Sequence, residues 1–188
     1  MEDEMARTQI NPIRLDRLAQ AVEQLDLDPI KFKMLHPEEG VGWMREKVDR
    51  VERVYRRFLF LVGTRSEPII LTKDVDVMWH HHILDTAKYR TDCDYLFGYF
   101  LDHFPYFGMR GQQDSEALFA SFTITRRIYQ EQFGSDMIID SLLEGEEFSV
   151  AMCDSNCYAS CGSHGGGGED EITRPWERPA LSALHISA

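Results

Sequence analysis

The chain has 188 residues, 43% of them hydrophobic, and its 32 acidic and 20 basic side chains give a net charge of −12. This length favours one domain that buries its core without disulfides, and no apolar run approaches the roughly 18 residues of a membrane span. The acidic surplus repels phosphate backbones, so we do not expect nucleic acid as a partner.

The first residues, MEDEMARTQ, are polar and acidic. They lack the basic start and the apolar stretch of a secretory signal. We therefore expect a cytoplasmic protein, with no membrane association and with reduced cysteines. Its partner is expected to be a protein or a small molecule.

Apolar residues at helical spacing predict two helices in the first third of the chain. The first begins at Pro12, a residue favoured in the first turn of a helix, and continues to Asp26. The second spans about residues 41–62, with arginines and glutamates on its exposed face. A short apolar segment between them, residues 30–35, is expected to be a linker.

Two more helices are predicted further along the chain. The third covers residues 73–97, with Thr72 as its N-cap. The segment 99–111 is aromatic and contains proline and glycine, so we expect an ordered loop that packs onto the helices. A fourth helix covers about residues 115–133. Because no alternating strand pattern competes, the fold class is all-α, a compact helical domain of about four main helices.

The segment Asp74–Gly108 concentrates the potential chemistry of the chain, with four of its seven histidines and six carboxylates. At about 100° per residue, a continuous helix turns His80 and His82 about 160° apart, so the two rings cannot bind the same small metal ion. One stripe of that helix is expected to be buried: Val75, Trp79, His82, Thr86, Tyr89 and Cys93. A second is expected to face solvent: His81, Asp85, Lys88 and Asp92.

Each of the two diverging histidines has a structural and a functional interpretation. His82 is either a hydrogen-bonded core residue or a ligand or general base, joined by Cys93 or by His103 from the aromatic loop. His80 has Asp76 one turn earlier, a spacing that orients an imidazole whether for stability, catalysis or metal binding. If the loop folds back, His103 meets one of them and forms a two-histidine and carboxylate site. The candidate metal ligands of the body, for zinc, iron or copper, are therefore His80, His82, His103, Asp76 and Cys93.

The run DVDVMWHHHILDTAKYRTDC, followed by FGYF and HFPYFGMRG, resembles the glycine-rich domain-containing protein-like family. The likeness covers roughly residues 15–134 and is closest to a short bacterial form. It implies a helical domain, and it implies that nucleic-acid binding in longer members belongs to added segments. The matching positions of the central pattern are Asp76, Trp79, His80, His82, Leu84, Thr86, Tyr89, Asp92 and Cys93.

The composition changes after Gly134. Residues 1–134 carry 22 acidic and 18 basic side chains, a net charge of −4, and residues 135–188 carry 10 and 2, a net charge of −8. We therefore expect two parts: a helical domain over 1–134 and an acidic, Cys- and Gly-containing, largely disordered tail over 135–188. Four potential soft ligands of the tail fall within 12 residues and form a second candidate metal site: Cys153, Cys157, Cys161 and His164.

Three classes of function fit these features. The first is a helical domain that binds a ligand, a metal or a protein partner near the histidine helix and the aromatic loop. The second is a metal-dependent enzyme that uses His80, His82 and His103 with Asp76 or Asp85. The third is a precursor peptide or metal carrier whose cysteine tail is modified or binds metal.

Overall fold

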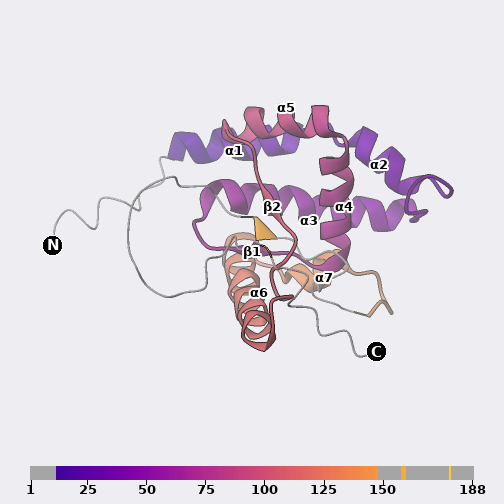
Figure 1. Cartoon of the computed structure of the whole chain (residues 1–188). Coiled ribbons are helices and arrows are strands. Elements are labelled where there is room, and N and C mark those ends of the chain that lie inside the picture. The colour runs from indigo at the N-terminus through magenta and orange to yellow at the C-terminus, as the bar shows by residue number, and fades with distance from the viewer. Residues whose placement is uncertain (1–11, 148–157, 160–177, 179–188) are drawn as a thin grey trace.

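In a computed structural model of the protein, residues 12–147, 158–159 and 178 are described, and helices dominate them (Figure 1). This confirms the predicted all-α class. No helix among these residues is both long and apolar enough to cross a bilayer. The elements in chain order are α1 (Pro12–Gln24), α2 (Asp28–Leu35), α3 (Arg45–Thr64), β1 (Ile69–Ile70), α4 (Lys73–Leu84), α5 (Thr86–Phe97), β2 (His103–Phe104), α6 (Gln112–Phe133), α7 (Met137–Ser141) and β3 (Tyr158–Ala159).

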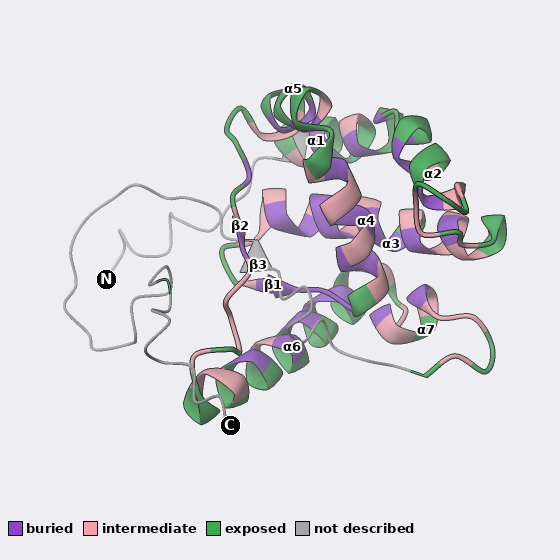
Figure 2. Ribbon diagram, turned by 45° about the vertical axis from the view of Figure 1, so that its right-hand side comes forward, coloured by how far each residue is buried: buried purple, intermediate pink, exposed green. Residues whose placement is uncertain are grey.

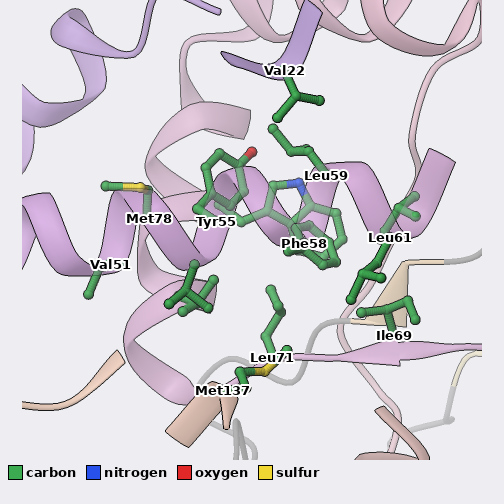
Figure 3. Packing of buried hydrophobic residues seen from close by; sticks show 14 of the residues in the cluster. Val22, Val51, Tyr55, Phe58, Leu59, Leu61, Ile69, Leu71, Met78 and Met137 are labelled. Carbon is green, nitrogen blue, oxygen red and sulfur yellow. The ribbon is translucent and has the colours of Figure 1, made fainter. Parts of the chain in front are cut away.

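Helix α3 forms the centre of the core, and α1, α4 and α7 pack around it (Figure 2). Its apolar side chains recur every three or four residues, so one face is continuously buried. Phe58 on this face lies in the buried cluster together with Tyr55 and Leu59 (Figure 3). Its ring centroid is 5.0 Å from that of Trp79 in α4. Each such fully buried side chain contributes about 1.5–3 kcal/mol to the free energy of unfolding. The histidine-bearing α4 is therefore fixed against the most buried part of the molecule.

The apolar segment expected to be a linker is helical. Residues Asp28–Leu35 form α2, with Pro29 in the first turn, where the missing backbone N–H costs no hydrogen bond. Ile30 and Met34, four residues apart, are both buried. The segment is short, but this pair gives it an apolar face that stabilises a helix. The following helix α3 begins at Arg45, a few residues later than expected.

The predicted third helix is two helices, α4 and α5, separated at Asp85. Asp85 leaves the helical conformation, with φ −82° and ψ 72°, and its carboxylate accepts a hydrogen bond from the Lys88 backbone N–H at 3.3 Å. An aspartate cap of this kind starts a new helix within an apparently continuous pattern. Because the chain changes direction here, two expectations are wrong. Asp92, which was expected to face solvent, is buried, and Thr86, which was expected to be buried, is exposed.

Three two-residue strands form a small antiparallel sheet in the order β1-β3-β2. Ala159 of β3 lies opposite Ile69 on one side and opposite His103 on the other. Strands this short were not expected, because two residues carry no alternating pattern. The sheet joins the aromatic loop, the segment before α4 and a piece of the C-terminal tail.

Helix α7 lies beyond Gly134, a left-handed helix cap with φ 71°. Its Met137 is fully buried, and its Asp140 pairs with Arg57 of α3 at 2.6 Å. The domain boundary expected at residue 134 stays a prediction, although this helix packs against the core.

Candidate functional site

One group of potential metal ligands comes together in the described part of the chain: Asp76, His80 and His103. Asp76 and His80 are one turn apart on α4, and His103 comes from β2 in the aromatic loop. The Nε2 atoms of the two histidines are 2.8 Å apart, and His80 Nε2 is 3.9 Å from Asp76 Oδ2. The ligand atoms of all three residues lie within 4.8 Å of one another. The loop thus folds back onto α4, and His103 meets His80, not His82.

The aromatic loop is held over α4 by a tyrosine of α5. The Tyr89 hydroxyl accepts a hydrogen bond from Trp79 Nε1 at 2.9 Å and donates one to the Leu101 carbonyl at 2.7 Å. Trp79 in turn packs edge-on against the His103 ring, with 5.0 Å between ring centroids. The position of His103 therefore depends on a buried hydrogen-bonded chain from α4 through α5 to the loop.

The electrostatics of the group favour neutral imidazole rings. Burial, with a smaller contribution from His80, lowers the pKa of His103 to about 4. Burial and the neighbouring His81 also lower the pKa of His80. Both rings are therefore neutral at pH 7 and carry the lone pairs that metal binding needs. The Asp76 side chain is 0% exposed and the His80 side chain 32% exposed, so the group is reached from solvent past His80.

His82 belongs to a separate, buried network. Its Nδ1 lies 2.8 Å from the Tyr55 hydroxyl, and its Nε2 lies 2.8 Å from Asp92 Oδ2. Lys88 pairs with the same carboxylate oxygen at 2.9 Å. The side chain is 1% exposed, and burial lowers its pKa more than Asp92 raises it. Both ring nitrogens have protein partners, so the structural interpretation of His82 as a hydrogen-bonded core residue is the one that the geometry supports.

Cys93 and Asp85 also lie apart from the group. Cys93 is a buried free thiol whose pKa is raised by burial. Asp85 caps α5, as described above. Among the described residues, then, the structure brings together three of the five candidate body ligands and leaves out His82 and Cys93. Cys153, Cys157, Cys161 and His164 lie outside the described residues, and their role stays a prediction.

Sequence reasoning expected a tyrosine, a carbonyl or a carboxylate as hydrogen-bond partner of a core His82, but it did not identify Tyr55 and Asp92. Asp92 was placed on the exposed face because the break at Asp85 was not foreseen. Tyr55 was assigned only to the apolar stripe of its helix. The one sequence signal for this network was the Asp85-Thr86 pair, which is a typical helix start.

Two surface hollows lie elsewhere on the molecule. One, of about 350 Å³, is lined by residues of α1 and α5, including Arg14, Arg17 and Tyr95. The other, of about 660 Å³, lies between α1, α3 and the end of α6 and includes Arg53 and Phe133. Neither is lined by Asp76, His80 or His103. The three-residue group is thus separate from both of these hollows.

Comparison with known proteins corrects one expectation. No curated protein and no solved structure matches the chain. A family model does match, and its description is UCP032817-like, over residues 16–130. The assignment to the glycine-rich domain-containing protein-like family is thus wrong, because the family that matches the helical body is a different one. The match spans more than half of the chain and includes all three residues of the group, and the chain belongs to the UCP032817-like family.

Proposed function

We propose that this protein binds a divalent transition-metal ion through Asp76, His80 and His103. The observation that carries the proposal is the convergence of two imidazole nitrogens and a carboxylate from two separate segments within 4.8 Å. A helical turn alone would place only Asp76 and His80 together. The loop that carries His103 folds back and adds the third ligand.

The distances fit a small rearrangement around an ion. Zinc binds histidine nitrogen and carboxylate oxygen at about 2.0–2.2 Å, so tetrahedral ligands lie about 3.3 Å apart. The observed separations of 2.8 Å and 3.9 Å lie on either side of that value. Side-chain rotations that bring the three ligand atoms, which lie within 4.8 Å of one another, to this separation would accommodate a metal. Two imidazoles and one carboxylate suit zinc or ferrous iron, and imidazole also binds copper.

A metal-dependent enzyme is the second candidate, and the number of protein ligands favours it. Three ligands leave at least one coordination position for water or substrate, as in catalytic zinc sites and in two-histidine, one-carboxylate iron sites. The partly exposed His80 gives that position access to solvent. A metal-bound water would then act as a nucleophile near neutral pH. In both versions we place the protein in the cytoplasm, with a protein or small molecule as partner and not nucleic acid.

The test needs a protein whose tail does not itself bind metal. The substitutions C153S, C157S, C161S and H164N in the full chain give what we call the tail-substituted protein. Zinc, ferrous iron and cupric ion are titrated into it by calorimetry, with iron under anaerobic conditions. Elemental analysis of the protein as purified gives the metal content.

We expect one ion per chain. In the same background H80A or H103A should weaken binding by about 100-fold, because each removes one of three ligands. H81A is the matched control, since His81 is adjacent on α4 but is not in the group, and it should bind like the parent. Equal affinity in H80A, H103A and the parent, or no binding by the parent, would overturn the proposal.

The metal-dependent enzyme requires an open coordination position on the metal, which can be tested separately. Cobalt(II) replaces zinc and gives a visible spectrum that reports coordination. Addition of azide should change the spectrum of the cobalt protein if a coordination position is open. An unchanged spectrum at saturating azide would show a closed, structural site and would exclude the enzyme version.

A further inference from the structure

Strands β1 and β2 are held apart by a piece of the C-terminal tail. They do not pair with each other, and β3 lies between them and pairs with both. The outer side of β1 is covered by α6, because the Ile70 N–H donates to Thr125 Oγ1 at 3.0 Å. In an antiparallel strand successive residues direct their polar backbone groups to opposite sides. The N–H and C=O of Ile69 therefore face the space that β3 fills.

This space, between Ile69–Ile70 and His103–Phe104, is called the strand slot below. An unoccupied slot would leave backbone donors and acceptors on both of its edges without sheet partners, which is costly at a buried position. With β3 in place, Ile69 and Ile70 are both 0% exposed, so the pairing completes the burial of the β1 edge. The slot is therefore suited to an extended peptide that offers hydrogen bonds on both sides.

The register connects the strand slot to the proposed metal site. Ala159 is the pairing partner of His103, whose Nε2 lies 2.8 Å from His80 Nε2. The side chain of His103 can hold its position only if its backbone is fixed. Tyr89 fixes the loop two residues earlier, at the Leu101 carbonyl. The strand pairing fixes it at His103 and Phe104.

We propose that the Tyr158–Ala159 segment of the tail is a docking strand that completes the metal site, so that docking in the strand slot and metal binding at Asp76, His80 and His103 strengthen each other. The inference rests on the proposed metal-binding function. Thermodynamic linkage requires the coupling to be reciprocal. The Tyr158–Ala159 segment of the tail thereby becomes a part of the site.

The chain's own segment is the occupant to which the proposal commits. It already pairs with both edges. Ten residues join it to Glu147, the last described residue before it, and such a linker spans at most about 38 Å. Because the segment and the strand slot belong to the same chain, docking is intramolecular, and a short linker gives an effective concentration of about the millimolar range.

The test compares A159P with A159G, both in the full-length tail-substituted protein. Proline removes the backbone N–H of Ala159 and is excluded from the middle of a sheet, whereas glycine keeps the N–H. G166P places a proline elsewhere in the tail and controls for its general effect. Hydrogen exchange of peptides that cover residues 66–72 and 100–108 reports the strand pairing, and calorimetry with zinc reports the site.

We expect A159P to exchange at least tenfold faster at both strand edges and to bind zinc about tenfold more weakly, while A159G and G166P resemble the parent. Zinc should in turn slow exchange at both edges in the parent but not in A159P. Unchanged exchange in A159P would overturn the docking, and faster exchange with unchanged zinc affinity would overturn the coupling. A parent that binds no metal would refute the proposed function and with it the coupling, while the exchange measurement would still decide whether the strand docks.

Discussion

Two histidines two residues apart on α4 have entirely different surroundings. His82 is buried, with Tyr55 on one ring nitrogen and Asp92 on the other. His80 is partly exposed, and its Nε2 lies against a second imidazole and near a carboxylate. The helix fixes this divergence, because a separation of two residues turns side chains about 160° apart. Residue type alone therefore says nothing about which histidine is structural and which is available for a ligand.

The hydrogen bonds explain the difference. A neutral imidazole has one donor and one acceptor nitrogen. In His82 both are used by protein groups, and a metal would have to displace one of them at the cost of a buried polar group. Between His80 and His103 one Nε2 donates a hydrogen bond to the other. A single ion can replace this hydrogen bond and bind both Nε2 atoms once the proton of the donor ring is on Nδ1. The hydrogen bond of His80 can thus be exchanged for a metal ion, whereas the hydrogen bonds of His82 are part of the folded core.

The largest effect on stability is expected from the removal of the His82 side chain. H82A would leave the buried Asp92 carboxylate and the Tyr55 hydroxyl without their shared partner, so we expect a loss of about 3 kcal/mol in the free energy of unfolding. Urea denaturation monitored by circular dichroism measures it. H80A should cost about 1 kcal/mol, because its ring is partly exposed and loses one hydrogen bond.

For zinc affinity we expect the opposite order of the two variants, with the larger loss in H80A and the smaller in H82A. H82A should bind zinc within a few-fold of the parent at temperatures where it is folded, and H80A should not. If H82A weakened zinc binding as strongly as H80A does, the two regions would form one site and the distinction would be wrong.

A smaller effect is expected at Tyr89, which lies between the two regions. Its hydroxyl joins Trp79 to the Leu101 carbonyl, and its ring packs edge-on against His82. Y89F keeps the ring but removes the hydroxyl, so we expect a loss of about 1–2 kcal/mol from the two buried groups left without this partner. Because the loop loses an anchor, zinc affinity should also fall about fivefold. A stability loss with unchanged zinc affinity would show that the strand pairing alone positions His103.

The helices were largely predictable because their apolar periodicity is long. The stripe of α3 and the left-handed glycine caps of α5 and α6 are features that a sequence displays directly. The break at Asp85 was not predicted, because apolar spacing continues across it and only one capping residue marks it. That single error placed Asp92 on the wrong face and concealed the His82 network.

The candidate site was predictable in part. Helix geometry separated His80 from His82 and paired His80 with Asp76 correctly. Which of them His103 would meet depended on how a loop folds back, and that is set by the Tyr89 hydroxyl and the strand pairing, contacts between residues far apart in space until folding brings them together. Two-residue strands have too little pattern to be recognised in advance, so the link between the tail and the loop could come only from the structure.

The smallest expected effect is a loss of folding stability at acidic pH, which arises from protonation of the histidines in the same two regions. Burial lowers the pKa of His103 to about 4, whereas an unperturbed histidine titrates near 6.5. Between these two values the His103 side chain is protonated in the unfolded chain but not in the folded protein. The free energy of unfolding therefore decreases as the pH falls from about 6.5 towards 4. Below pH 4 both states are protonated, and the loss stops growing.

The pKa values of His80, His81 and His82 are also lowered, so these residues add losses of the same sign as the pH falls below about 6.5. H103N removes the titration of His103 from this set, so the metal-free variant should lose about 1 kcal/mol less stability between pH 7 and pH 5 than the parent does, a value reduced for the partial exposure of the ring. Urea denaturation in the presence of a chelator measures both slopes. If the unfolding free energy of parent and variant changed equally with pH, the His103 ring would have the same pKa in the folded protein as in the unfolded chain. The ring would then be as solvated as in the unfolded chain, and the site would not keep two neutral imidazoles in contact.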